Sequence, residues 1–249
     1  MIILALFIFT VLAEVPVWAK VVANFDECKE FFYRGTEPQG MDQNARKICQ
    51  KYEYGGNFYA SLYSTYHRIP VYSAYKFNCS CKDQKNQVGP KSGPWFIEPQ
   101  VRLYFFYFIQ LSYQGEDTMQ PETNNNRDRV KSNQAVNGDY CNTGYDRGHL
   151  NPNSFQCDDD RKATFTLTNS APMDACFNRV PWKQWEQRVR DILKDNAVSG
   201  TAYLVTGTVP PSEDFRIPRQ GQFDDPSFAG LATVQPLQWR PLPALGNSH

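Results

Sequence analysis

One short segment constrains this chain more than any other. Residues 145–153 read YDRGHLNPN and place His149 directly after an aspartate, an arginine and a glycine. The chain has three histidines, of which His249 is the last residue and His67 precedes a predicted strand. A general base that works near neutral pH is therefore expected at His149. The competing interpretation is a hydrogen-bonded loop histidine without a chemical role.

The charge balance limits how the chain can bind a polyanion. Lys plus Arg and Asp plus Glu each number 26 in 249 residues, so the formal net charge is zero. A local basic patch would have to hold nucleic acid, and indiscriminate coating of a polyanion is excluded. The hydrophobic content of 41% is typical of a globular protein with one sizeable core or two small ones.

The first residues predict export. Residues 2–13 are apolar, and Val17 and Ala19 place small side chains where a signal peptidase reads them, so we expect a signal peptide over residues 1–19. A membrane anchor is disfavoured because about 12 apolar residues are too few to span a bilayer. We expect a secreted protein without stable membrane association, and disulfides among its seven cysteines.

Residue patterns predict an α+β protein with several strands and one long helix. Strands are expected at 69–77, 101–111, 163–169 and 202–207 because β-formers are concentrated there. The helix follows Pro181, since Trp182, Trp185, Val189 and Ile192 recur at one helical face. We expect a long solvated loop over 114–139, a charged turn at 158–161 and an irregular Pro-rich tail over 210–249.

Three polar residues accompany this helix. Asn178 lies at its start, and Glu186 and Arg190 follow at steps of four, which places them near one face. An amide oxygen beside a carboxylate suits Mg²⁺, which keeps most of its waters, and His149 could then deprotonate a water for attack on phosphorus. The alternatives are an N-cap at Asn178 and a surface pair of Glu186 and Arg190.

These motifs together resemble the DNA/RNA non-specific endonuclease family, in particular its secreted vertebrate branch. The resemblance rests on 145–153, on 163–173 and on Asn178, Trp182 and Glu186, and it covers roughly 28–207. It implies an α+β fold in which a ββα-metal (His-Me finger) core is set in a larger antiparallel sheet. The nuclease domain would span 20–209, and the sheet would be incomplete at its C-terminal side, because no strand is recognised after Gly207.

The resemblance also implies roles for individual residues. His149 matches the general base, with Arg147 as the motif arginine; Asn178 matches the amide that binds one Mg²⁺ ion, and Glu186 the acid that orients waters around that ion. Mn²⁺ or Ca²⁺ could replace Mg²⁺. Substrate-binding positions are assigned to Asp146, Asn169 and Arg190.

The expected function is therefore a secreted, Mg²⁺-dependent, non-specific endonuclease acting on DNA, RNA or both. An alternative is a secreted binding protein of weak activity that keeps the nuclease fold. A serine hydrolase is disfavoured because no Gly-x-Ser-x-Gly elbow is found. The substrate preference and the oligomeric state are left open.

Overall fold

The structure is a computed structural model that describes residues 21–41, 44–53, 55–78, 95–101, 118–196, 200–209, 216–217 and 231–232. The expected signal peptide, most of the strand expected at 101–111 and most of the tail lie outside the described residues. Within the described ranges, no helix combines the length and the apolar character needed to cross a membrane.

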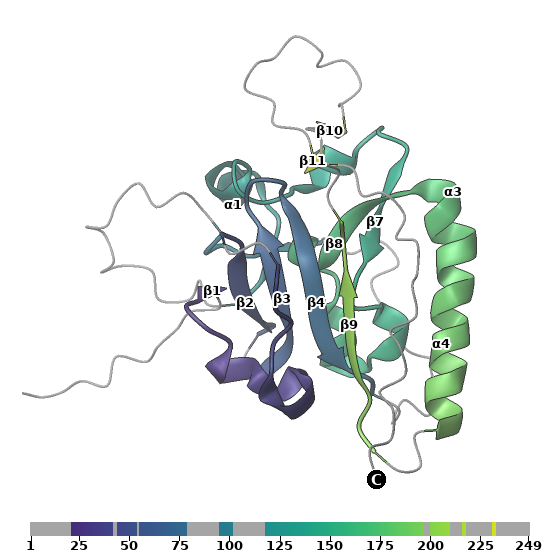
Figure 1. The fold of residues 1–249 in the computed structure, drawn as a ribbon. Helices are drawn as coiled ribbons and strands as arrows, with labels where there is room; N and C mark the ends of the chain where they lie inside the picture. Colours follow the sequence, from purple (N-terminus) through teal and green to yellow (C-terminus); the bar gives the residue numbers. More distant parts are fainter. Residues whose placement is uncertain are drawn as a thin grey trace, which may run out of the picture.

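A five-stranded antiparallel sheet forms the centre of the molecule, in the order β1-β2-β3-β4-β9 (Figure 1). Its strands are β1 (Val21–Val22), β2 (Arg46–Lys51), β3 (Asn57–Ser64), β4 (Ile69–Lys76) and β9 (Tyr203–Gly207). The strands predicted at 69–77 and 202–207 are confirmed as β4 and β9. Because β3 and β4 are buried on both faces, they lack the alternation of a half-exposed strand.

One face of the sheet packs against an aromatic segment near the N-terminus. The 3-10 helix η1 (Asp26–Phe31) contributes Phe31 to a buried cluster with Leu62 and Tyr72. A disulfide between Cys28 and Cys49, with 5.8 Å between the Cα atoms, fixes η1 to β2. This pair confirms that the chain forms a disulfide, and Cys157 is also disulfide-bonded, whereas Cys141 and Cys176 are free and exposed.

Buried tyrosines of the sheet form hydrogen bonds to segments that pack against it. The Tyr59 hydroxyl donates to the Ala163 carbonyl at 3.1 Å, and the Tyr63 hydroxyl accepts from the Ala135 amide at 3.0 Å. Both side chains are fully buried. A buried tyrosine combines a large apolar ring with one polar atom that needs a partner, so each hydroxyl fixes a loop to the sheet.

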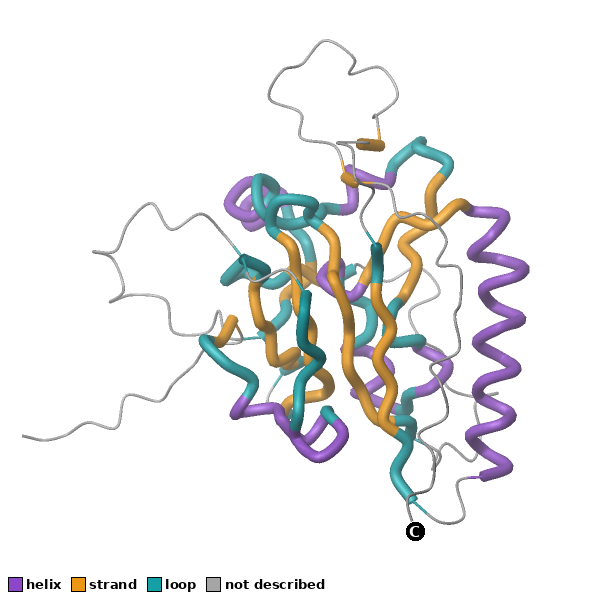
Figure 2. The backbone as a smooth tube through the Cα atoms, in the orientation of Figure 1, coloured by secondary structure: helices purple, strands orange, loops and turns teal. Residues whose placement is uncertain are grey.

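A smaller β-hairpin and a helical column form the layer that carries the sequence motif. Strand β7 (Tyr145–His149) pairs antiparallel with β8 (Ser170–Asp174). The chain continues through α3 (Ala175–Phe177), the π-helical turn η6 (Asn178–Trp182) and α4 (Lys183–Asn196), which make one continuous column in Figure 2. This ββα unit beside an antiparallel sheet confirms the expected α+β fold.

Short elements complete the described chain. They are η2 (Tyr33–Gly35), β5 (Phe96–Ile97), β6 (Gln120–Pro121), α1 (Asn124–Val130), η3 (Asn137–Tyr140), η4 (Asn153–Phe155), α2 (Asp158–Ala163), η5 (Leu167–Asn169), β10 (Arg216–Ile217) and β11 (Leu231–Ala232). Strand β5 pairs with β6, and β10 with β11, which places one short antiparallel pair in the tail expected to be irregular.

Three local predictions were wrong. The solvated loop over 114–139 contains α1, because the Thr123 side chain and Asn126 form a capping box at its start. The charged turn at 158–161 is part of α2, whose three acidic residues in the first turn favour a helix N-terminus. The strand expected at 163–169 is not formed: Ala163 ends α2, residues 167–169 form the 3-10 helix η5, and the strand starts only at Ser170.

The packing face of α4 is wider than the expected one and differs from it at one residue. Trp182, Trp185 and Val189 are partly buried as expected, whereas Ile192 is half exposed and Leu193 packs beside Val189 on a buried cluster. Glu186 and Arg190 are also partly buried, so two of the candidate site residues face the body of the protein.

The Arg68–Asp139 pair yields a stability prediction. Arg68 donates to the Asp139 carboxylate at 3.3 Å, and both side chains are almost completely buried. Arg68→Met leaves that carboxylate buried without its cation, so we expect a loss of about 3 kcal/mol in the free energy of unfolding. Urea denaturation measures this change in the free energy of unfolding. The control Lys162→Met breaks the half-exposed Lys162–Asp159 pair and should cost below about 1 kcal/mol. Equal losses would contradict this assignment.

Candidate active site

Strand β7 presents the DRGH motif, and its glycine is required by packing. A Cβ atom on Gly148 would lie 2.8 Å from Cε and 2.9 Å from Cβ of Met173 on β8. Real Cβ contacts are longer, so only glycine lets β8 approach β7 this closely. The close approach determines where the next residue, His149, leaves the strand.

His149 packs against two aromatic rings that also contact each other. Its ring centroid is 4.9 Å from that of Trp95 and 4.9 Å from that of Phe165. The residue keeps some exposure, but its Nε2 atom is buried and has no hydrogen-bond partner. Burial, together with the charges of Arg147 and Arg161, lowers the pKa of His149 to about 3. The imidazole is therefore neutral, with a free lone pair or N–H at Nε2.

Arg147 is held beside the histidine by two contacts. Its guanidinium donates to the Asn137 side-chain oxygen and lies over the Trp95 ring, 4.9 Å from the centroid. Burial lowers the pKa of Arg147 from its ordinary value, yet an arginine stays protonated. The same indole thus supports both the arginine and the histidine of the motif.

Asp146 orients Asn178 and does not face an anion. Its carboxylate accepts from Asn178 Nδ2 at 3.1 Å and from two nitrogens of Arg179 at 2.8 Å each. These donors lower the pKa of Asp146 against the effect of its partial burial. The sequence assigned Asp146 to substrate binding; in the structure its carboxylate pairs with Asn178 and Arg179.

Asn178 is suited to bind a hard cation. Because its amide nitrogen donates to Asp146, its oxygen points away from that bond, and no donor among the described residues reaches the oxygen. The described residues contain no group of three or more His, Cys, Asp or Glu side chains that could hold a metal. One free amide oxygen fits an ion such as Mg²⁺ that keeps most of its waters.

Glu186 is the second candidate for this ion. Burial raises the pKa of Glu186 from 4.5 to about 7, while Trp182, Arg190 and Lys183 act in the opposite direction. The Trp182 indole N–H is near enough to lower the pKa without the geometry of a full hydrogen bond. A carboxyl group that is costly to ionise without a cation fits a position beside a divalent ion.

Arg161 is a site residue that the sequence did not indicate. Its Nε atom is buried without a hydrogen-bond partner, and no carboxylate of the described chain pairs with its guanidinium. Burial and the nearby charge of Arg190 lower the pKa of Arg161, and Arg161 in turn acts on His149. Helix α2 carries it to the site, and no signal within 158–161 separated Arg161 from a solvated charge.

Asn169 lies behind the site and is fully buried. Its oxygen accepts from the Ser73 hydroxyl at 2.8 Å and the Asn151 amide at 2.9 Å. Its nitrogen donates to the carbonyls of Asn151 at 3.1 Å and Thr164 at 2.9 Å. The sequence assigned Asn169 to a substrate contact; in the structure its buried amide already has two donors and two acceptors as partners.

The site therefore has two parts along the ββα unit. The first contains His149 with the cations Arg147 and Arg161, which together suit a phosphate and a nearby nucleophile. The second contains Asn178, oriented by Asp146, and Glu186 beside Arg190. A neutral base, arginine side chains that can hold a phosphate and a candidate metal-binding position are the groups needed to hydrolyse a phosphodiester.

Comparisons with known proteins identify the family of this chain. The model of the DNA/RNA non-specific endonuclease family matches residues 40–222. The Endonuclease domain-containing 1 proteins of Homo sapiens and Mus musculus are 36% identical over 212 residues and 32% identical over 217 residues. Each alignment covers 84% of this chain and 39% of the relative.

A solved structure of an EndoG/EndoGI complex matches with a TM-score of 0.41 and 21% sequence identity, covering 63% of this chain and 53% of that one. The chain belongs to the DNA/RNA non-specific endonuclease family, as the motif resemblance predicted. It spans about two fifths of the length of the two curated relatives.

The raised pKa of Glu186 predicts a pH-dependent stability effect. In EDTA, ionisation of the buried carboxyl favours the unfolded chain, so its cost is absent below pH 4.5 and complete above about pH 7. Glu186→Gln removes this cost and should raise the melting temperature at pH 8 by roughly 5 °C, with little change at pH 4. The control Glu30→Gln alters an exposed carboxylate and should shift neither value. An equal shift at both pH values would show that Glu186 ionises freely.

Proposed function

We propose that this protein is a secreted, Mg²⁺-dependent endonuclease that hydrolyses phosphodiester bonds of DNA, RNA or both with little sequence preference. Family membership supports nuclease chemistry, and the neutral, unpartnered Nε2 of His149 beside two arginines is the observation that carries the proposal. A neutral imidazole can take a proton from water, and a phosphate held by the arginines brings the negative charge that raises its pKa.

Each residue of the site has a defined task in this proposal. His149 removes the proton from the attacking water at Nε2. Arg147 and Arg161 hold the phosphate oxygens and stabilise the charge that develops on them. Arg190 contributes further positive charge next to Arg161. Trp95 and Phe165 keep the imidazole in one orientation by packing their rings against it.

The Asn178 and Glu186 side chains are suited to bind one divalent cation. The Asn178 oxygen would bind the ion and Glu186 would orient its waters, with Asp146 holding the Asn178 amide in place. When bound, the ion supplies positive charge to the phosphate and the leaving oxygen. Mn²⁺ or Ca²⁺ could occupy the same oxygen site.

Secretion is part of the proposal. The apolar N-terminal segment supports it, and the Cys28–Cys49 disulfide is consistent with an oxidising compartment. The alternative function is a secreted protein that binds nucleic acid on the same fold with weak catalysis. The low pKa of His149 is the feature that favours this alternative, because a weaker base removes protons less readily.

Substitution of the base tests the mechanism. His149→Ala should lower the rate of plasmid nicking by roughly 10²–10⁴-fold, because that range is typical for loss of a general base, while the melting temperature stays close to that of the wild type. His67→Ala, in the turn between β3 and β4, is the matched control and should keep full activity. Near-normal nicking by His149→Ala would show that another group is the base.

Substitution of the amide tests the cation site. Asn178→Ala should move the Mg²⁺ concentration for half-maximal nicking upward by roughly tenfold or more, since the ion loses its amide ligand. Gln184→Ala, at an exposed position on α4, should leave the titration unchanged. EDTA should abolish nicking by the wild type. Nicking that persists in EDTA, or a folded wild type that binds DNA without cutting it, would favour the alternative.

A further inference from the structure

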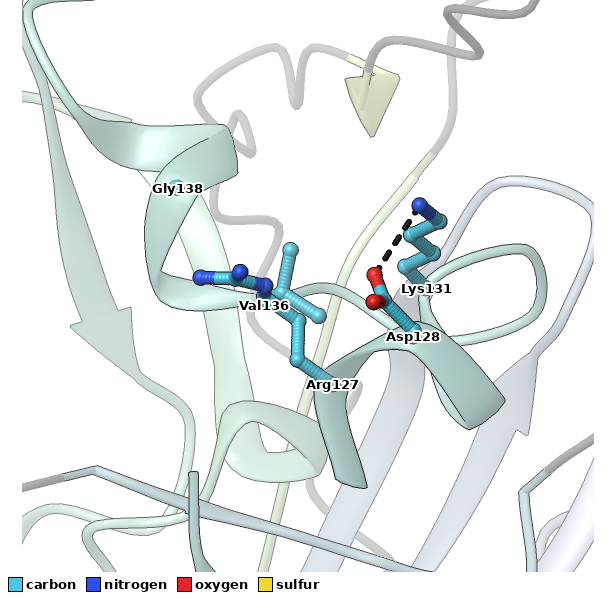
Figure 3. Close-up of a pocket in the computed structure, with 5 residues that line it drawn as sticks. All are labelled: Arg127, Asp128, Lys131, Val136 and Gly138. Atoms are coloured by element: carbon cyan, nitrogen blue, oxygen red, sulfur yellow. Dashed lines mark ion pairs between the residues drawn. The ribbon is translucent and has the colours of Figure 1, made fainter. Parts of the chain in front are cut away.

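A cationic pocket lies outside the site, between helix α1 and the turn η3. It has a volume of about 330 Å³ and is lined by Arg127, Asp128, Lys131, Val136 and Gly138. Figure 3 shows the Arg127 side chain reaching from α1 toward Val136 and Gly138, while Lys131 and Asp128 pair at the other side. Two cations against one carboxylate give the pocket a positive balance.

Arg127 is a cation without a fixed partner. Its guanidinium forms neither a hydrogen bond nor an ion pair with any described side chain, although the side chain is only partly exposed. Lys131, in contrast, binds Asp128 at 3.0 Å. A guanidinium matches phosphate geometry with two parallel hydrogen bonds, so Arg127 is the residue of this pocket best suited to a phosphate.

The two walls of the pocket are joined by a buried arginine. Arg68 donates to the Lys131 carbonyl at the end of α1 at 2.6 Å and to the Asp139 carboxylate in η3. Val130 and Val136 also belong to one buried cluster. The pocket is therefore preformed and does not require a ligand to bring α1 and η3 together.

The same turn connects the pocket to the active site. Asn137 lies between Val136 and Gly138 of the pocket and accepts the hydrogen bond from Arg147. The Glu122 carboxylate accepts from the Asn137 backbone and side-chain amides at 2.6 and 2.8 Å, which holds Asn137 in place. A nucleic-acid strand carries a phosphate at every nucleotide, so a strand that contacts Arg147 presents further phosphates to the turn that contains Asn137 and lines the pocket.

We propose that this pocket is a second phosphate-binding subsite, in which Arg127 and Lys131 hold the backbone of a nucleic acid whose scissile phosphate lies at His149. The inference rests on the proposed function. It predicts that the pocket contributes to binding of long substrates and not to chemistry, because no pocket residue touches the base or the candidate cation ligands. The Asp128 carboxylate repels a phosphate and forms an ion pair with Lys131, which weakens binding at this pocket.

The test compares variants of one helix on a long and a short substrate. In the His149→Ala background, binding of a fluorescent 16-base-pair duplex is measured across salt concentrations, with Arg127→Gln against Arg129→Gln. Arg129 has the same charge on the same helix but does not line the pocket. Arg127→Gln should weaken binding by roughly three- to tenfold and lower the salt slope by about 0.9, the loss of one phosphate contact.

Two further experiments test whether the charge of the pocket controls binding and whether the pocket acts on binding or on chemistry. Asp128→Asn should tighten duplex binding, because it frees Lys131 and removes a negative charge. With His149 intact, Arg127→Gln should raise KM for the duplex without changing kcat. It should leave cleavage of a small thymidine phosphodiester unchanged, because that substrate is too short to reach the pocket.

Equal effects of Arg127→Gln and Arg129→Gln on an active enzyme would overturn the subsite and leave the proposed function standing. A loss of thymidine ester cleavage in Arg127→Gln would also overturn it, because the residue would then act at the scissile phosphate. A wild-type protein that neither binds nor cuts nucleic acid would overturn the proposed function and the subsite with it.

Discussion

The buried amide of Asn169 holds the sheet and the motif hairpin in one arrangement. It accepts from Ser73 on β4 and bonds in both directions to Asn151, two residues after His149, while its other donor hydrogen binds the Thr164 carbonyl. An unsatisfied buried amide would cost about 1–3 kcal/mol for each lost partner, so these segments are fixed together. The position of His149 relative to the sheet depends on this network.

The second constraint is electrostatic. His149, Arg147 and Arg161 are brought together where desolvation disfavours positive charge, and Arg190 is close to Arg161. Partly buried cations that repel one another do not stabilise a fold, and such clusters are characteristic of sites that bind an anion. Asp146 and Glu186 do not relieve this repulsion at the histidine, because Asp146 is paired with Arg179 and Glu186 is itself difficult to ionise.

Local sequence patterns predicted two strands of the main sheet and the long helix. The strands β4 and β9 and helix α4 were recognised. The strand expected at 163–169 failed because its alternating threonines are buried: Thr168 accepts from Gln50 on β2, a contact 118 residues away. Helix α1 was missed because its asparagines and charges lack an apolar stripe, and a capping box determines its start.

The sequence by itself determined the family, the identity of the base candidate, and the amide and carboxylate candidates on the helix, because these are set by residue types at short, fixed spacings. Only the tertiary structure decided which polar residues face the site. It paired the Asp146 carboxylate with Asn178 and Arg179, satisfied the buried Asn169 amide, and brought Arg161 of α2 close enough to act on His149. The physical reason is that burial and hydrogen-bond satisfaction depend on neighbours from distant segments, and neither is encoded in the spacing of the residues themselves.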